Sequence, residues 1–286
     1  MWCRMKIAII GDTSRADAWE KHLRKLSAIH EVVITSSLEK KNDVDAALLL
    51  DDGTKNLSSL EHLIKLGLHT YFISQLPSDS AVLEKMYRLA RESNVRVQFS
   101  HWPTLAPASM WMIQQMKKPD LIQIKREVQM IPNSTAQSNI DHHWIDEVGW
   151  ATKILGGNVH RVEAKQLSVE KKRVGISINL RYEDASVAAI QFSALGNQNI
   201  HQRTISDGTI SIDCDAIRQH VKLFRENSYG NIKSETHNFD PKLTAENSVF
   251  QFVKSIQLKK EAPFNPYDAY QTALITEKIL KQLDKN

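Results

Sequence analysis

The sequence predicts a two-domain α/β protein. A Rossmann-type, doubly wound parallel sheet over residues 1–118 is expected to precede an α+β domain with a mostly antiparallel open sheet over residues 119–286. The length of 286 residues exceeds the usual size of one domain. In the first part, short apolar runs alternate with helical patterns, which is typical of βαβ units. After Lys118, apolar runs follow one another without helices between them, which indicates antiparallel pairing.

The first domain is expected to contain five strands and the helices that connect them. An apolar run stops at Gly11, and the helical spacing of Trp19, Leu23 and Leu26 follows it. A later helical pattern ends at Gly67, a residue type that commonly terminates helices. The expected strands are residues 6–10, 31–36, 44–50, 70–73 and 95–99, and the expected helices are residues 16–26, 57–66 and 80–92.

The second domain is expected to pack one long amphipathic helix on an antiparallel sheet. The helix covers residues 140–155 and ends at Gly156-Gly157. In residues 174–182 apolar and polar side chains alternate, so one sheet face can pack on the helix while the other lies in water or meets a second subunit. We therefore expect a homo-oligomer formed through this sheet. The expected strands are residues 121–128, 159–169, 174–182, 186–193, 200–206 and 209–213, and residues 248–258 and 267–283 are the closing helices.

Composition and charge exclude several classes of protein. Hydrophobic residues make up 42% of the chain and charged residues 24%, which is ordinary for a globular protein. The net charge of +4 is spread along the chain, so no nucleic-acid surface is expected. Cys3 and Cys214 make no disulfide framework, and neither a signal peptide nor a membrane span of roughly 20 apolar residues is recognisable. The protein is therefore expected to be cytoplasmic, without a membrane partner.

Four stretches carry a resemblance to a known family from Met5 to about Leu283. They are Lys-Ile-Ala-Ile-Ile-Gly from Lys6, Asp-Val-Asp-Ala-Ala-Leu-Leu-Leu from Asp43, Gly-Leu-His-Thr-Tyr-Phe-Ile-Ser-Gln-Leu-Pro from Gly67, and His143-Trp-Ile-Asp followed by Trp150 and Gly156-Gly157. In order and spacing they resemble the Gfo/Idh/MocA family of NAD(P)-dependent oxidoreductases. The resemblance implies a small-molecule substrate, namely a sugar, polyol or related carbonyl compound, and NAD or NADP as coenzyme.

The chain departs from this family at the catalytic lysine. The third stretch resembles the family's EKP segment, whose lysine orients the substrate and helps to move its proton. The matching residues here are Gln75, Leu76 and Pro77. A leucine can neither ionise nor donate a hydrogen bond, so the role of the lysine is absent at this position. By resemblance, Gln75 and Pro77 remain candidate contacts of the coenzyme.

The turn after the first strand is the expected diphosphate site. A dinucleotide turn uses glycines for the bend, for the approach of the diphosphate and for helix packing. Gly11 keeps the bend, whereas Thr13 places a branched side chain at the middle position, and Asp12 adds a negative charge that Arg15 could offset. The helix start at Ser14 can attract an anion. Gly11, Thr13, Ser14 and Arg15 are therefore candidate coenzyme contacts, and a plain strand-to-helix connection is the alternative.

The end of the second strand bears on the choice between NAD and NADP. The family's acid for the ribose hydroxyls is replaced by a Thr-Ser-Ser segment, residues 35–37, with Lys40 and Lys41 after it. Hydroxyls followed by lysines could hold a 2′-phosphate, so Ser36 is a candidate contact and NADP is favoured over NAD. A polar loop without a ligand is the alternative. By resemblance, Asp51 begins the nucleotide-contacting loop after the third strand.

The long helix carries the candidate catalytic residues. By resemblance His143 is the family's histidine, and Asn139 stands where the family often has an aspartate, four residues earlier and on the same helix face. Asparagine can hold a hydroxyl or carbonyl group but cannot accept a proton at neutral pH. His143 is therefore a lone acid or base, a ligand anchor, or a half-buried structural histidine. His142 is a candidate substrate contact.

Two pairs on this helix have the spacing of metal ligands. They are His143 with Glu147 and His142 with Asp146. A third ligand is missing, and Asp146 fits a structural position of the family better. No metal is therefore expected.

His101 and Trp102 follow the fifth strand, near the expected crevice of the Rossmann sheet, and are candidate substrate contacts. Trp102 could stack on a nicotinamide or sugar ring, or belong to the core between the domains. Two functions stay open. The first is an NAD(P)-dependent oxidoreductase that acts through His143 and Asn139. The second is a non-catalytic relative that binds a ligand or an oligomeric partner, which the combined losses of lysine, middle glycine and acids favour.

Overall fold

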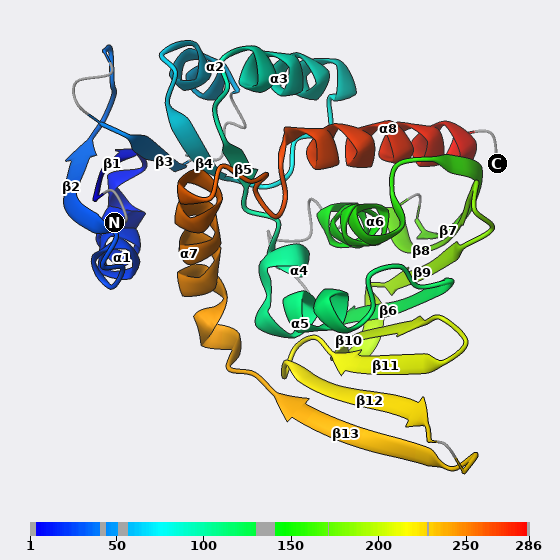
Figure 1. The fold of residues 1–286 in the computed structure, drawn as a ribbon. Coiled ribbons are helices and arrows are strands. Elements are labelled where there is room, and N and C mark those ends of the chain that lie inside the picture. The colour runs from blue at the N-terminus through cyan, green and yellow to red at the C-terminus, as the bar shows by residue number, and fades with distance from the viewer. Residues whose placement is uncertain are drawn as a thin grey trace. The chain divides into compact units, whose positions relative to one another are not determined.

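The structure divides into two compact units, whose elements Figure 1 shows along the chain. It is a computed structural model that describes residues 4–40, 44–50, 57–129, 141–170, 172–227 and 229–284. The first unit consists of Met1–Leu105 with Lys242–Ala273, and the second unit consists of Ala106–Pro241 with Leu274–Asn286. Within the described ranges, no helix combines the length and the apolar character needed to cross a membrane.

The first unit is built around a five-stranded parallel sheet with the order β2-β1-β3-β4-β5. All residues of β3 are buried, as expected for a strand that is covered on both faces. The strand order reverses between β1 and β3, so their carboxyl ends form the switch point at which Rossmann sheets bind nucleotides. The strands are β1 (Met5–Gly11), β2 (Ile29–Thr35), β3 (Ala46–Leu50), β4 (His69–Ile73) and β5 (Val97–Phe99). The predicted parallel sheet is confirmed.

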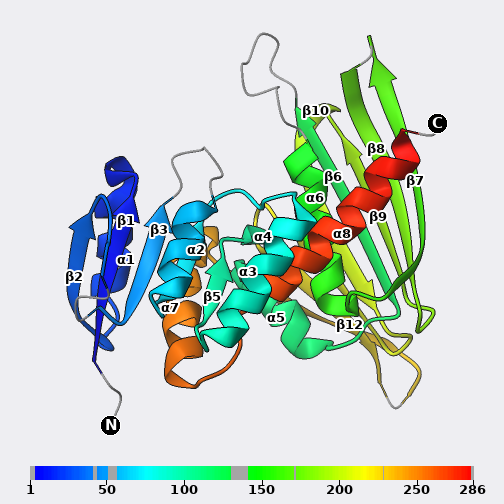
Figure 2. The same ribbon diagram turned by 90° about the horizontal axis from the view of Figure 1, so that it is seen from above.

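Helices cover both faces of this sheet, as Figure 2 shows from above. On one face, α1 and α7 bury Trp19, Leu23 and Phe252 against β1, β3 and β4. On the other face, α2, α3 and the first turns of α8 close a second core around Leu63 and Met86. The helices are α1 (Ala16–Arg24), α2 (Ser58–Lys65), α3 (Ser80–Glu92), α7 (Thr244–Gln257) and α8 (Pro266–Leu283). The first unit therefore has three layers, α/β/α.

The C-terminal part of the chain completes the first unit. Residues 242–273 return to it, and their helix α7 contributes Val249, Phe252 and Val253 to the core on the α1 side of the sheet. The sequence-based boundary after Lys118 placed α7 in the second domain, and Lys118 itself lies inside the second unit. The physical reason for the difference is that an amphipathic pattern shows which helix face is buried but not which sheet it covers.

The second unit is built around an eight-stranded sheet with the order β13-β12-β11-β10-β6-β9-β8-β7. Among the described strands, β6 and β9 pair in parallel and all other neighbours are antiparallel, which confirms the predicted class of sheet. The strands are β6 (Leu121–Gln129), β7 (Val159–Val169), β8 (Lys172–Tyr182), β9 (Val187–Ser193), β10 (Leu195–Ser206), β11 (Ile210–Asp215), β12 (His220–Glu226) and β13 (Ile232–Asn238). Strands β12 and β13 were not predicted: β13 has almost no apolar side chains, whereas the alternating Val221 and Leu223 of β12 were overlooked.

One face of this sheet is apolar and covered by helices. The covering elements are α5 (Pro107–Gln115), α6 (Asp141–Leu155) and the last turns of α8. In β8 the side chains of Ile178 and Leu180 face this core, whereas Ser177 and Asn179 are exposed, which confirms the predicted alternation. Helix α6, which carries the candidate residues His142 and His143, therefore packs on the apolar face of the sheet.

We expect Phe252→Ala to lower the free energy of unfolding by about 3–5 kcal/mol, because this fully buried ring fills the core between α7 and the parallel sheet. Phe250 lies on the same helix with 44% of its surface exposed. Phe250→Ala, as a matched control, should change the free energy by less than about 0.5 kcal/mol. Urea unfolding followed by circular dichroism measures both changes, and equal effects would contradict the assignment of α7 to this core.

Candidate functional site

Gly11 makes the bend of the expected diphosphate turn. Its φ of +104° lies in the left-handed region that favours glycine, and an added Cβ would lie 2.2 Å from the Leu50 carbonyl oxygen. Gly11 pairs with Leu50 at the ends of β1 and β3, which is the switch point of the sheet. A 3₁₀ turn, Thr13–Arg15, then leads into α1. The backbone bend has the shape that a nucleotide turn requires.

The Asp12 carboxylate already accepts the donors of this turn. Ser14 donates to Asp12 Oδ1 from its backbone N–H over 3.0 Å and from its hydroxyl over 2.6 Å. Arg15 Nε donates to Asp12 Oδ2 over 2.8 Å. The hydrogen bonds from Ser14, and then that from Arg15, lower the pKa of the Asp12 carboxyl below its usual value. Asp12 is thus a built-in anion at the start of α1.

A bound diphosphate would need these same donors. The Asp12 side chain keeps 28% of its surface exposed, so it has room to rotate into solvent. A diphosphate at this turn would have to displace the Asp12 carboxylate from Ser14 and Arg15, and breaking these contacts opposes binding. Ser14 and Arg15 stay candidate contacts on this condition. The side chain of Thr13 lies outside the described residues.

The other expected coenzyme contacts differ in accessibility. Ser36 is exposed immediately after β2, and Gln75 is exposed after β4. Pro77 is buried, so only the backbone of its turn is available to shape a nucleotide site. Asp51 lies outside the described residues. Ser36 and Gln75 are therefore the two side chains of this group that the structure leaves within reach of a ligand.

Leu76, which stands in place of the family's lysine, has a packing role. Its side chain is half-buried and lies against the core formed by α2 and α3. A lysine at this position would carry a charge along apolar surface, where desolvation is unfavourable. Leu76 therefore contributes to hydrophobic packing and supplies neither an acid nor a base.

His101 and Trp102 have different surroundings. His101 is only 2% exposed, its ring stacks on Phe264 at a centroid distance of 3.9 Å, and its Nδ1 lies 2.8 Å from Thr104 Oγ1. This burial speaks against the expected substrate contact, because the ring is already packed within its own unit. Trp102 stacks on Trp19 with the ring centroids 6.3 Å apart and keeps 41% of its surface exposed. Its role as an aromatic ligand contact stays a prediction.

Asp141 anchors the first turn of α6. It accepts a hydrogen bond from Trp144 Nε1 over 2.9 Å, and Arg173 Nη1 of β8 donates to its two oxygens over 2.9 and 3.0 Å. An acidic residue in the first turn also interacts favourably with the helix dipole. The neighbouring rings of His142 and His143 lie 3.9 Å apart between their centroids. This anchoring sets the direction of both candidate histidines, whereas Asn139 lies outside the described residues.

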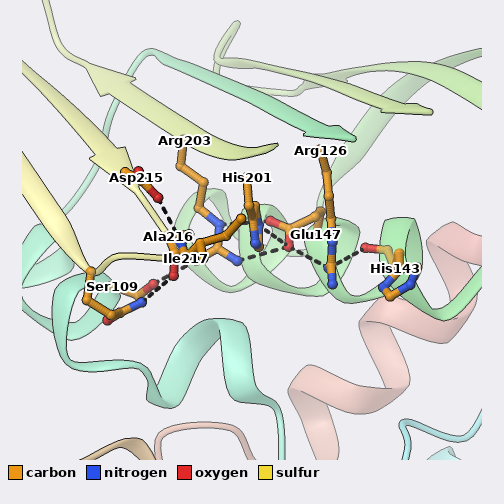
Figure 3. A network of polar contacts seen from close by, with 10 residues as sticks. Ser109, Arg126, His143, Glu147, His201, Arg203, Asp215, Ala216 and Ile217 are labelled. Atoms are coloured by element: carbon orange, nitrogen blue, oxygen red, sulfur yellow. Dashed lines mark hydrogen bonds and ion pairs between the residues drawn. The ribbon is translucent and has the colours of Figure 1, made fainter. Parts of the chain in front are cut away.

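A buried ionic network is centred on Glu147 of α6 (Figure 3). Arg203 of β10 binds both carboxylate oxygens, through Nε over 2.8 Å and through Nη2 over 2.9 Å. His201 Nε2 lies 2.9 Å and Arg126 Nη1 lies 3.3 Å from Glu147 Oε1. The side chain of Glu147 is fully buried. One carboxylate therefore ties α6 to the adjacent strands β6 and β10.

The same arginines reach further side chains and backbone groups. Arg203 Nη1 donates to the Ser109 hydroxyl of α5 over 2.7 Å, and its guanidinium lies 4.7 Å from the Trp150 ring centroid. Arg126 Nη1 donates to the His143 carbonyl oxygen over 3.1 Å. The helical turn that carries His143 is thus held from the sheet side by Arg126.

Charge pairing and burial set the protonation states in this region. Burial alone would raise the pKa of Glu147, but the Arg203 guanidinium and His201 hold it well below its usual value. Burial raises the pKa of Asp146 to about 7. Burial, together with the Arg126 guanidinium, lowers the pKa of His143 to about 3. At neutral pH His143 is therefore a neutral imidazole beside a cation.

A neutral imidazole can donate and accept hydrogen bonds but is a weak base when its pKa is about 3. Its Nδ1 atom is buried and has no hydrogen-bond partner among the described residues. Of the alternatives raised by the sequence, this arrangement disfavours a proton acceptor, and both a ligand anchor and a half-buried structural histidine fit it. His142 lies beside it, half-buried. No group of three His, Cys, Asp or Glu side chains suited to a metal occurs in the ranges that the structure describes.

The sequence reasoning missed Arg126, His201 and Arg203, and considered Glu147 only as a metal ligand. The sequence did contain a signal for Arg203. In a strand, alternate residues share one face, so Arg203 lies on the same face as His201 and the apolar Ile205. A charged residue on the apolar face of a strand requires a buried partner. The sequence alone does not show that this partner is Glu147, which lies 56 residues away.

We expect Glu147→Gln to lower the free energy of unfolding by about 3–5 kcal/mol at neutral pH, because it leaves the Arg203 charge buried without a counter-ion. The folded-state pKa of Glu147 is depressed, so the stabilisation is present above pH about 4.5 and lost only in strongly acidic solution. Glu163 forms an exposed ion pair with Arg161 over 2.7 Å. Glu163→Gln should cost less than about 1 kcal/mol, and a comparable loss in both variants, measured by chemical unfolding, would refute the network's structural role.

The whole fold is shared with solved dehydrogenases and oxidoreductases. UDP-N-acetylglucosamine 3-dehydrogenase GnnA from Acidithiobacillus ferrooxidans superposes with a TM-score of 0.82 and 12% identity, over 99% of this chain and 98% of that one. An NAD binding oxidoreductase from Klebsiella pneumoniae gives a TM-score of 0.80 and 12% identity, over 98% and 97% of the two chains. Levoglucosan dehydrogenase, in complex with NADH and L-sorbose, gives 0.76 and 12%, over 99% and 97%.

Sequence comparison adds no closer relationship, since no protein-family model and no curated protein matches this chain. The agreement with the solved structures nevertheless extends over nearly the full length of both partners, including the parallel and the mostly antiparallel sheet. The chain thus has the fold that the resemblance to the Gfo/Idh/MocA oxidoreductases predicted.

Proposed function

We propose that this protein is an NAD(P)-dependent oxidoreductase that acts on a sugar, a polyol or a related carbonyl compound. The observation that carries the proposal is Gly11, whose positive φ and close approach to Leu50 build a nucleotide-type bend at the switch point of a parallel sheet. The full-length fold shared with dehydrogenases supports it. Hydride transfer is the chemistry that a bound NAD or NADP would supply.

In this proposal, residues of the chain bind and orient the coenzyme and the substrate. The Ser14 N–H and the Arg15 guanidinium would hold the diphosphate after Asp12 turns away. Ser36, with Lys40 beyond it, would contact the adenosine ribose and favour NADP, because Ser36 stands where the family's acid would repel a 2′-phosphate. Gln75 and Trp102 are accessible for further contacts. Asp51, Thr13 and Pro77 keep the backbone or loop roles assigned by resemblance.

His143 would hold the substrate rather than move its proton. As a neutral imidazole it can donate a hydrogen bond to a carbonyl or hydroxyl oxygen, and the Arg126 contact to its backbone fixes its position. His142 and Asn139 would complete the substrate contacts.

A second function, a non-catalytic protein that binds a ligand or an oligomeric partner, is favoured by two specific observations. Asp12 occupies the donors of the diphosphate turn, and Leu76, half-buried against the core of α2 and α3, stands where an acid/base lysine would be needed. Under either function we propose self-association through the sheet of the second unit and a cytoplasmic location. Cys214, a free and buried thiol, is consistent with a reducing compartment.

Coenzyme binding separates the two functions. We expect NADPH, and more weakly NADH, to quench the tryptophan fluorescence of the protein saturably. Asp12→Asn should tighten the dissociation constant about three- to tenfold, because it removes a negative charge next to the diphosphate. Asp17→Asn is the matched control, since Asp17 is exposed in the first turn of α1 and should leave the constant unchanged. Absence of binding at millimolar coenzyme in both wild type and Asp12→Asn would eliminate the oxidoreductase proposal.

The substrate role of His143 can be tested by measuring turnover on a panel of sugars and polyols. We expect His143→Ala to raise KM by about tenfold, which corresponds to about 1.4 kcal/mol for one hydrogen bond to the substrate. His143→Asn, which keeps a donor, should recover part of this loss. Leu76→Lys should retain activity, because the role of the lysine is not used at this position. Unchanged kinetics in His143→Ala would remove the substrate role assigned to this residue.

A further inference from the structure

Strand β13 is an open edge of the second unit's sheet. It lies at one end of the strand order and pairs with β12 on one side. Six of its seven residues are exposed, as is Tyr229 in the preceding turn, at 86%. Ile232, the first residue of the strand, is 67% exposed although it is apolar. A regular edge strand offers backbone donors and acceptors to another strand.

The hydrogen bonds between β12 and β13 determine which backbone groups face outward. Phe239 N donates to the Gln219 carbonyl oxygen over 3.0 Å, and Asn227 N donates to the Asn231 carbonyl oxygen over 2.9 Å. Because hydrogen-bonded pairs alternate along an antiparallel ladder, the odd-numbered residues of β13 bond to β12. The N–H and C=O groups of its even-numbered residues, such as Ser234, therefore point away from the sheet.

We propose that β13 pairs antiparallel with β13 of a second copy, around a two-fold axis at Ser234 that stands perpendicular to the sheet. Only even-numbered residues have outward backbone groups, so hydrogen-bonded pairs form where even residues face even residues. With the axis at Ser234, the two Ser234 residues face each other and Ile232 faces Thr236 of the other copy. The sheet then continues from one subunit into the next.

The charges on the strand select this register. With the axis at Ser234, Lys233 faces Glu235 of the other copy, and the two-fold axis repeats this pair. These residues fall at non-hydrogen-bonded positions, where facing side chains are closest. A shift of the axis to residue 233 would place two lysines opposite each other, and a shift to residue 235 would place two glutamates opposite each other. Lys233 has no ion pair among the described residues, and Glu235 has only distant ones, at 3.7 Å to Arg225 and 3.9 Å to His237.

The opposite edge strand, β7, is protected in ways that β13 is not. The pairing of β7 with β8 shifts register at two places, whereas β12 and β13 pair without a break from His220 to Glu226. Register irregularities twist an edge and hinder further pairing. The charge of Glu163 on β7 is also already paired with Arg161 over 2.7 Å. The features that favour strand addition are thus concentrated on β13.

The test measures the oligomeric state of the full chain by sedimentation velocity across a dilution series. We expect a dimer for the wild type. Lys233→Glu and Glu235→Lys should each weaken it about tenfold or more, since both symmetric pairs become repulsive. The double variant Lys233→Glu/Glu235→Lys should restore dimerisation to within about threefold, because it exchanges the charges across the axis. Lys222→Glu, on the open face of β12 and away from the edge, is the matched control and should leave the dimer intact.

A second variant tests the backbone contact. Ser234→Pro removes an outward N–H that is not needed within the chain, so it should abolish the dimer while circular dichroism stays unchanged. A monomeric wild type, a double variant that fails to recover, or a dimer that responds to Lys222→Glu but not to Lys233→Glu would overturn the proposal. The last outcome would place the contact on the open sheet face. Coenzyme titration is unaffected by these outcomes, so the edge contact and the oxidoreductase proposal fail independently.

Discussion

The buried carboxylate of Glu147 is the constraint around which the second unit is organised. A charge in an apolar interior is tolerated only when it is paired and fully hydrogen-bonded, and Arg203 meets this need with two contacts. Arg126 and His201 add contacts from two adjacent strands. A helix held by such a pair cannot slide along the sheet without leaving charges unpaired. The pairing therefore fixes the register of α6 and, with it, the direction of His143.

At the diphosphate turn and around Glu147, charged side chains are paired within the chain, and this pairing shapes the chemistry that the neighbouring groups can perform. At the diphosphate turn, the anion that the helix start attracts is the protein's own Asp12 carboxylate. Near His143, the Arg126 cation and burial remove the proton that an acid/base histidine would carry. At the proposed coenzyme turn a diphosphate would compete with the internal contacts of Asp12, and a substrate proposed to bind at His143 would meet a neutral hydrogen-bonding group. Tight positioning with weak proton transfer is the expected result.

In the sheet of the second unit, the backbone polar groups of the central strands and those of the edge strand β13 have different surroundings. Its inner face is closed by helices, and the backbone groups of its central strands are paired within the sheet. At β13 the apolar pattern ends, and the outward backbone groups are left with water or with another strand as partners. With the proposed axis at Ser234, Lys233 and Glu235 make that edge complementary to itself. The proposed self-association through this edge rests on ladder geometry and charge order, and it does not depend on the chemistry at α6.

The sequence by itself determined the two sheets, their order along the chain and the amphipathic direction of β8 and α6, because hydrophobic periodicity is a local property of neighbouring residues. It also located Gly11 at a bend and showed that Leu76 cannot act as a lysine. Only the tertiary structure decided that Arg203 meets Glu147, that Asp12 turns back onto Ser14, and that α7 completes the first unit. These depend on which distant groups come together to neutralise a charge or cover a face. Such pairings follow from packing in three dimensions, which no spacing along the chain records.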